Sequence, residues 1–260
     1  MKTNYHSHIA LCRHAEGTSE EHIKKAIEHN FDIFGISDHA PLIKIGNIPS
    51  DRTFLHRMKL NELDDYISEL QECKSKYKDK IQVLIGLETE YFESHHEYIK
   101  RLSNKVDYLI FGNHDFIYDG KTISSFSIKR EHHVLEYAKN TIKAFKTGFY
   151  KFMSHPDLFL LGGEWNEVSE RVAHIIAKAS IEYDVPLELN ANGIRRGTIK
   201  SPQGLRYHYP RKEFWDIVKT YNCKVIVNSD AHHFTEHNDA EFHEAHRLAA
   251  EWGLNTIKIL

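Results

Sequence analysis

Three histidines near the start of the chain have a spacing that suits a metal site. Residues 2–8 are predicted to form a short strand, on which side chains at positions i and i+2 point the same way, so that His6 and His8 project from one face. His14 follows six residues later, after a short loop. Neutral imidazole is the commonest metal-binding side chain in proteins. The competing explanation is coincidence, because 20 of the 260 residues are histidine, and this stretch alone favours neither.

The rest of the chain alternates between predicted strands and predicted helices. Six more apolar runs have the length of buried strands and occupy residues 31–37, 81–87, 106–112, 149–154, 185–189 and 223–228. Helical spacing is found at about 19–30, 54–77, 129–146, 166–183, 210–221 and 239–252. Such alternation predicts parallel βαβ units. Because no linker and no change in composition divides the chain, we expect one domain over residues 1–260.

Histidines and carboxylates occur at the same end of most of the predicted strands. Six of the seven carry them at or just beyond the carboxyl end, namely His6 and His8, Asp38 and His39, Glu88, His114, His155, and Asp230 with His232. In a closed parallel barrel these ends converge on one face, where such enzymes place their sites. Random placement of histidines would not select strand ends, so the whole set favours a metal site over coincidence.

The types of candidate ligand indicate which metals would bind. Imidazoles with a few carboxylates and no thiolate suit zinc, iron or manganese. The candidates exceed what one ion can use, so two or more ions are implied, with Glu88 or Asp230 as possible bridging groups. Two ions roughly 3.5–4 Å apart can stabilise both the attacking and the leaving oxygen of a phosphoryl displacement.

Composition narrows the function classes further. A net charge of −3 provides no basic surface, so we expect no nucleic-acid partner. No apolar run approaches the roughly 20 residues that a membrane span needs, and the first residues lack the apolar core of a signal peptide. The three cysteines are odd in number and form no CxxC pair, which favours a reducing cytoplasm.

Several other features are assigned simpler roles. We expect solvent exposure for the histidines that lie in charged or helical stretches, which are His22, His29, His95, His96, His132, His133, His237, His243 and His246. The connection at residues 40–53 is long, and long structured loops often act as lids.

Taken together, the motif blocks resemble those of the PHP (polymerase and histidinol phosphatase) superfamily. The blocks are HSH with His14, SDH at 37–39, GLE at 86–88, His114, SHPD at 154–157 and SDAH at 229–232, and they follow in order along nearly the whole chain. The resemblance implies an α/β fold, a distorted (β/α)7 TIM-like barrel. It also implies a trinuclear centre of divalent zinc, iron or manganese. Its ligands by position are His6, His8, His14, His39, Glu88, His114, His155, Asp230 and His232.

Within that superfamily the chain is most similar to the histidinol-phosphatases. The likeness lies in Cys12-Arg13-His14-Ala15 and in SDHAPL at 37–42. It implies hydrolysis of L-histidinol phosphate in L-histidine biosynthesis by attack of a metal-bound hydroxide, with Glu88 and Asp230 essential for catalysis. Asp38 could bind metal or orient His39, and we favour the orienting role because metal-bound imidazoles usually donate their other N–H to an acceptor.

The substrate would need groups for its phosphate, its leaving oxygen and its imidazole and amine. Guanidinium forks match phosphate oxygens, which makes Arg13, Arg195 and Arg196 candidates for binding phosphate. His233 is a candidate general acid. Candidates for the imidazole and amine are Glu90, Asp157, Glu188 and Asn190, with Tyr91 or Phe116 as possible stacking partners.

Two alternatives stay open at the level of sequence. One is a phosphatase or phosphoesterase of the same superfamily that acts on phosphotyrosine, a nucleotide or another small phosphate ester. The other is a non-catalytic protein that stores or senses metal. The sequence leaves the oligomeric state open.

Overall fold

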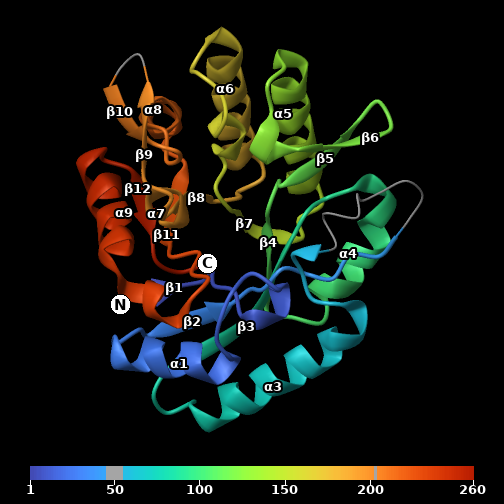
Figure 1. Cartoon of the computed structure of the whole chain (residues 1–260), viewed down its shortest axis with the longest axis vertical. Helices are drawn as coiled ribbons and strands as arrows, with labels where there is room; N and C mark the ends of the chain where they lie inside the picture. Colours follow the sequence, from blue (N-terminus) through green and yellow to red (C-terminus); the bar gives the residue numbers. More distant parts are fainter. Residues whose placement is uncertain (45–54, 202–203) are drawn as a thin grey trace.

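A curled parallel sheet forms the centre of the molecule (Figure 1). The computed structural model describes residues 1–44, 55–201 and 204–260. Eight strands pair in the order β1-β2-β3-β4-β7-β8-β11-β12, and each neighbouring pair is parallel. Their bounds are Thr3–Asn4, Ile33–Ile36, Gln82–Thr89, Tyr108–Phe111, Tyr150–Met153, Leu187–Asn190, Lys224–Asn228 and Asn255–Ile257.

Helices surround the sheet, as Figure 1 shows. They are α1 (Ser19–Glu28), α3 (Leu63–Lys76), α4 (His96–Ser103), α5 (Glu131–Lys146), α6 (Glu167–Glu182), α7 (Asn192–Arg195), α8 (Lys212–Thr220) and α9 (Ala240–Glu251). Short 3-10 turns are η1 (Ala10–Cys12), η2 (Leu60–Glu62), η3 (Glu93–His95), η4 (Ser125–Ser127), η5 (Leu158–Leu160) and η6 (Phe234–Asn238). Two hairpins, β5 (Asp115–Tyr118) with β6 (Lys121–Ser124) and β9 (Thr198–Ser201) with β10 (Gly204–Tyr207), lie outside the main sheet.

The curled sheet brings its first and later strands close together. The backbone N–H of His8 donates to the carbonyl of Ala231 at 2.8 Å, and Ser7 and Ala231 form a parallel bridge. Below them, the backbone N–H of Tyr5 donates to Asn228 Oδ1 at 2.8 Å. By contrast, β7 and β8 share a single paired position, Met153 with Leu187, where the sheet is distorted. The predicted α/β architecture with a distorted TIM-like barrel is confirmed.

Several local expectations need correction. The first strand covers only Thr3–Asn4, and the apolar tail adds an eighth strand, β12, to the seven expected. The helix predicted over 54–77 begins at Leu63, after η2. Neither hairpin was predicted, and most of the proposed lid, residues 45–53, lies outside the described residues. Within the described ranges, no helix is long and apolar enough to cross a membrane.

Three of the histidines expected in solvent are buried instead. Each ring has a hydrogen-bond partner inside the protein: His22 Nε2 lies 2.8 Å from the carbonyl of Glu16, and His95 Nε2 lies 2.7 Å from that of Ile43. His237 Nε2 lies 2.9 Å from His22 Nδ1. Helical spacing did not reveal this burial, because the partners come from distant segments.

An apolar plug fills the curled sheet beneath the carboxyl ends of its strands. It consists of Tyr5, Ile33, Tyr108, Ile110, Phe152 and Ile226. The Tyr108 hydroxyl donates to the carbonyl of Tyr5 at 2.6 Å. The ring occupies the space that glycines leave on β2 and β3, since a Cβ at Gly35 would lie 2.1 Å from the hydroxyl oxygen and one at Gly86 would lie 2.3 Å from Cζ. The glycine of the GLE block is therefore needed for packing.

Replacing Gly86 by alanine should destabilise the protein by about 1–3 kcal/mol, because the ring of Tyr108 has no room to retreat inside a packed core. Denaturant unfolding of the purified proteins would measure the change. Gly163→Ala is the matched control, since a Cβ there meets no described atom within 4 Å. Equal unfolding midpoints for Gly86→Ala and Gly163→Ala would contradict the packing argument.

Candidate metal centre

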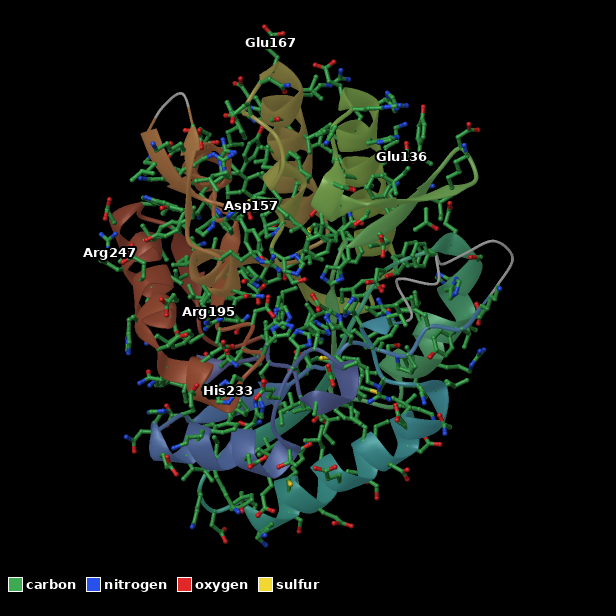
Figure 2. All side chains as sticks on the ribbon, viewed as in Figure 1. Glu136, Asp157, Glu167, Arg195, His233 and Arg247 are labelled. Atoms are coloured by element: carbon green, nitrogen blue, oxygen red, sulfur yellow. The ribbon has the colours of Figure 1, made fainter. Side chains whose placement is uncertain are left out.

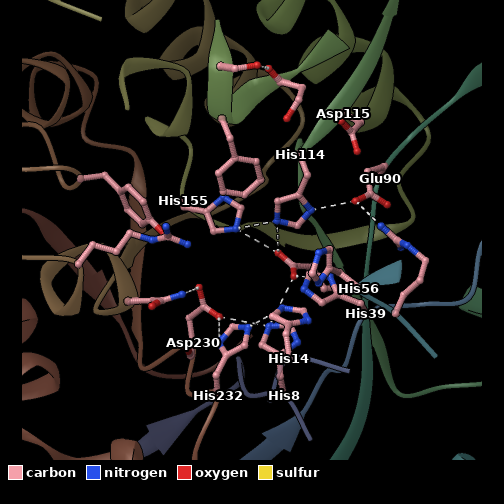
Figure 3. Close-up of a pocket in the computed structure, with 18 residues that line it drawn as sticks. His8, His14, His39, His56, Glu90, His114, Asp115, His155, Asp230 and His232 are labelled. Carbon is pink, nitrogen blue, oxygen red and sulfur yellow. Dashed lines mark hydrogen bonds and ion pairs between the residues drawn. The ribbon is translucent and has the colours of Figure 1, made fainter. Parts of the chain in front are cut away.

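A pocket of about 650 Å³ opens at the carboxyl ends of the strands (Figure 3). Eight of the nine expected ligands line it, namely His8, His14, His39, Glu88, His114, His155, Asp230 and His232. The ninth, His6, is fully buried and lies in contact with His8 and Asp230. The structure therefore gathers the whole set, although its members come from six separate segments of the chain.

The first group of ligands lies at the floor of the pocket. His6 and His8 point the same way, as the i, i+2 spacing predicts, and their Nε2 atoms are 3.1 Å apart. Asp230 Oδ1 lies 3.2 Å from His8 Nε2 and 3.5 Å from His6 Nε2. This buried oxygen has no hydrogen-bond donor among the described residues. Two ring nitrogens and an unpartnered carboxylate oxygen suit a divalent cation.

The second group surrounds Glu88. Its Oε1 lies 3.2 Å from His155 Nε2 and 3.5 Å from His114 Nε2, and its Oε2 lies 3.2 Å from His39 Nδ1. The same Oε2 lies 3.5 Å from His6 Nε2, so this carboxylate reaches both groups. Glu88 is placed as a bridging group would be.

The third group consists of His14 and His232, whose Nε2 atoms face each other at 3.1 Å. The His14 Nδ1 lies 2.9 Å from the carbonyl of Cys12, and the His232 Nδ1 lies 3.2 Å from the carbonyl of Asp230. A carbonyl only accepts hydrogen bonds, so in the neutral rings each Nδ1 carries the hydrogen and each Nε2 keeps a lone pair. Two lone pairs facing each other repel unless a cation lies between them, and this is the fit expected of a metal site.

Carboxylates orient three of the remaining rings from outside. His6 Nδ1 lies 2.8 Å from Glu188 Oε1, and His114 Nδ1 lies 2.9 Å from Glu90 Oε1. Asp38 Oδ1 lies 3.2 Å from His8 Nδ1, so the orienting role favoured for Asp38 acts on the ring of His8. Outward bonds of this kind fix the tautomer of a metal-binding histidine and raise its basicity.

The charges of the buried groups match this arrangement. Burial by itself raises the pKa of Glu88, but His114, His6 and His39 lower that pKa well below its usual value. Burial and the neighbouring His8 lower the pKa of His39 well below its usual value and lower the pKa of His232 to about 3. Glu88 therefore stays anionic, and His39 and His232 stay neutral. Although burial lowers the pKa of His6, His8 and His114, the carboxylates facing these rings raise it above its usual value, so a metal ion would bind them by displacing protons.

The structure separates the three arginines that were candidates for phosphate. Arg196 lines the pocket, and its Cζ lies 5.9 Å from the ring centres of both Phe126 and Tyr209. Arg195, labelled in Figure 2, is held by Asp239 at 2.6 Å and donates to the carbonyl of Ser229 at 2.6 Å.

Arg13 binds Glu62, with Nη2–Oε1 of 2.6 Å. Among the described residues, the pocket wall includes neither Arg13 nor Arg195. Their expected phosphate-binding role is corrected, because other partners hold both guanidinium groups.

Most of the other substrate candidates lie outside the pocket wall, and Glu90, which does line it, is engaged by other residues. His233 Nδ1 lies 2.7 Å from Thr235 Oγ1 and the ring is outside the pocket wall, which argues against its role as general acid (Figure 2). Asp157 accepts from the backbone N–H of Arg211 at 2.6 Å. Phe116 and Tyr91 belong to the hydrophobic core. Glu188 and Glu90 orient ligands, and Asn190 donates to Asp230 Oδ2 at 3.0 Å.

Part of the pocket wall was not anticipated. It comes from the β5–β6 hairpin and from segments without any motif, and its members include His56, Arg57, Asp115, Ser124, Phe126, Ser127, Asn192 and Tyr209. Arg57 Nη2 donates to Glu90 Oε1 at 2.9 Å, which links this wall to the His114 partner. No local spacing identifies these residues, because long-range packing alone brings them to the site.

Substituting Glu88 by glutamine should release metal while the fold survives, because the neutral amide keeps the volume but cannot bridge two cations. Removing a residue that only hydrogen-bonds to a metal ligand typically lowers metal affinity about 10–100-fold. Loss of the Glu88 carboxylate, which is itself a candidate ligand, should lower metal affinity at least as much. Elemental analysis of the purified protein, with thermal unfolding on the same sample, measures both effects. Glu244→Gln is the control, since that carboxylate pairs with Arg247 on the surface. Full metal content in Glu88→Gln would refute the central role.

Comparisons with known proteins agree with this fold. Two curated relatives are both named "Probable histidinol-phosphatase". The protein of Schizosaccharomyces pombe is 24% identical over 89% of this chain and 81% of its own length, and that of Deinococcus radiodurans is 22% identical over 87% and 85%. A solved structure from Lactococcus lactis, histidinol phosphate phosphatase with zinc, L-histidinol and phosphate, superposes with a TM-score of 0.71 at 20% identity. It covers 98% of this chain and 95% of that one, and so it supports the fold.

A family model decides the classification. The model of the PHP domain matches residues 4–192, which include seven of the nine candidate ligands. The remaining two, Asp230 and His232, lie beyond the match but in the same cluster. The chain belongs to the PHP domain family.

Proposed function

We propose that this chain is a metal-dependent phosphomonoesterase that hydrolyses L-histidinol phosphate to L-histidinol and phosphate in L-histidine biosynthesis. The observation that carries the proposal is the placement of Glu88 between two groups of imidazoles, in a pocket whose wall also contains Arg196. The names of the curated relatives and the ligands of the Lactococcus lactis structure support the choice of substrate. We assign residues 1–260 to one catalytic domain, since β1 and β12 belong to the same sheet.

Three divalent ions are the occupancy that we propose for the centre. Three groups of candidate ligands support it. The first is His6, His8 and Asp230; the second is Glu88 with His39, His114 and His155; the third is His14 and His232. The zinc in the Lactococcus lactis structure favours zinc here, with iron and manganese as alternatives of similar ligand preference. Ions bound there would supply Lewis-acid chemistry, lowering the pKa of a water and neutralising charge on phosphoryl oxygens.

Arg196 is the side chain to which we assign the phosphate. Its guanidinium presents a planar fork of N–H donors, which matches phosphate oxygens and keeps its charge at all relevant pH values. The rings of Phe126 and Tyr209, each 5.9 Å from Cζ, restrict where this group can lie. Donors held in advance opposite the equatorial oxygens stabilise the charge that spreads over them during transfer.

The remaining wall would receive the alcohol half of the substrate. Asp115 and Ser124 are paired across the β5–β6 hairpin, and both line the pocket, with Phe126 and Ser127 just beyond them. A carboxylate, hydroxyls and an aromatic face suit a small molecule that carries an amine and an imidazole. We propose that the hairpin wall binds this half while the phosphate lies between Arg196 and the metal ligands.

Arg196→Ala should lower kcat/KM for histidinol phosphate by about one to two decades, because a charge-assisted hydrogen bond is worth roughly 1.5–3 kcal/mol. Metal content should stay unchanged, and Arg196→Lys should recover part of the loss, since an ammonium cannot reproduce the fork. Inorganic phosphate should inhibit the parent more strongly than Arg196→Ala. Arg13→Ala is the control, because Glu62 holds that guanidinium outside the pocket wall. An equal effect of both alanine variants would overturn the assignment.

A substrate panel tests the activity itself. The metal-loaded protein should release phosphate from L-histidinol phosphate with a higher kcat/KM than from phosphotyrosine or a nucleotide monophosphate, and a chelator should abolish turnover. The reason is that the hairpin wall contacts the leaving alcohol, whereas the metals and Arg196 contact only the phosphate that all these esters share. Preference for another ester would replace the substrate proposal, and absence of turnover with every ester would refute the enzyme.

A further inference from the structure

The third ligand group depends on two loops that are far apart in the sequence. His14 lies in the connection between η1 and α1, and His232 lies between β11 and η6. The two Nε2 atoms face each other at 3.1 Å, although 218 positions separate the residues. Unlike Glu88, which is in a regular strand, neither ligand is held in place by a strand of the sheet. Contacts outside the sheet must therefore hold the two loops at a fixed distance from each other.

One direct backbone contact joins the loops. The N–H of Glu16 donates to the carbonyl of His232 at 2.7 Å. Within the first loop, the N–H of Ala10 donates to the carbonyl of Gly17 at 3.1 Å, which closes the segment that carries His14. The position of His14 relative to His232 is therefore set close to Glu16.

A buried pair of histidines holds the other side of Glu16. His22 Nε2 lies 2.8 Å from the Glu16 carbonyl, which only accepts, so this nitrogen carries the hydrogen. The neutral ring of His22 then has a lone pair at Nδ1, and His237 Nε2 donates to it at 2.9 Å. The result is a directed chain of hydrogen bonds from His237 in η6, through His22 in α1, to the backbone of Glu16.

Packing leaves this chain of hydrogen bonds little freedom. Both rings are fully buried, and His237 lies edge-to-face against Phe34 with ring centres 4.7 Å apart. Gly17, at φ +93°, lets the loop pass close to the pair, since a Cβ there would lie 2.9 Å from Phe234 Cδ1 and 3.0 Å from His22 Nε2. Burial lowers the pKa of both His22 and His237, so the rings stay neutral at neutral pH and the directions of the bonds are retained.

We propose that His22 and His237 are positioning residues that hold the Glu16 segment against His232 and thereby keep His14 and His232 at the distance a shared cation needs. The inference rests on the proposed metal centre. It predicts that the pair controls the ion bound by His14 and His232 more than the ions around Glu88, which the strands of the sheet position directly.

The test uses the zinc-loaded protein and three variants. His237→Leu keeps much of the volume but removes the donor, whereas His237→Gln places an amide N–H near the former Nε2. His174→Leu is the control, since that ring lies on α6, contacts Tyr221 Oη at 3.0 Å and is not among the described residues that line the pocket. The readouts are zinc per chain, the time course of zinc transfer to a chromogenic chelator, and thermal unfolding of the metal-free proteins.

His237→Leu should transfer one zinc per chain at least about tenfold faster than the parent, an effect of the size seen when partners of metal ligands are removed. The other ions should leave at the parental rate, His237→Gln should restore slow transfer, and His174→Leu should match the parent. A parental time course for His237→Leu would overturn the inference. Equal acceleration by His237→Leu and His237→Gln would do so too, because the hydrogen bond would then not be the cause.

A substitution of His22 provides a second test if His237→Leu does not fold. His22→Leu removes both the donor to the Glu16 carbonyl and the acceptor for His237, so it should show the same selective acceleration, and a parental time course would overturn the inference. Failure of the proposed function can be distinguished from failure of this inference. Zinc that responds to these variants in a protein without phosphatase activity would leave the positioning role intact and refute the enzyme.

Discussion

The constraint on which the site depends is an excess of electron pairs facing one another inside a buried pocket. His14 and His232 direct their Nε2 lone pairs at each other, and Asp230 adds a carboxylate oxygen without a donor among the described residues. Glu88 remains anionic although it is fully buried. Arranged in this way, the groups repel one another unless cations lie among them, and a buried unpaired charge is costly. Cation binding therefore accounts for the geometry as a whole.

The surrounding structure maintains this arrangement by engaging the outward side of five of the ligand rings. Carboxylates hold the rings of His6, His8 and His114, while backbone carbonyls hold those of His14 and His232. Beneath the site, the ring of Tyr108 fills the curled sheet and leaves the ligands facing only the pocket side. Ligand orientation thus follows from packing on one side and hydrogen bonds on the other.

The arginines show how the same residue type is put to different uses. Arg195 and Arg196 are adjacent in the sequence, yet the first binds Asp239 and the carbonyls of Ser229 and Glu236, while the second faces the pocket. By donating hydrogen bonds to those carbonyls, Arg195 stabilises the segment that carries Asp230 and His232. Its contribution to the site is therefore indirect, and of this adjacent pair only Arg196 lines the pocket.

The sequence by itself determined the parallel α/β architecture and predicted the nine candidate ligands that the structure brings together. The architecture and the candidates at strand ends follow from local rules: the i, i+2 spacing of His6 and His8, apolar runs that end in histidine or carboxylate, and the convergence of strand ends in a barrel. The assignment of all nine residues as ligands rests on the resemblance to the PHP superfamily. Only the tertiary structure decided which of the candidate arginines reaches the pocket, that His22 and His237 are buried, and that residues of the β5–β6 hairpin line the pocket. The physical reason is the range of the contacts involved. The partners of His237, Arg13 and Arg57 lie 215, 49 and 33 positions away, and no local pattern encodes pairings that form only when the chain has folded.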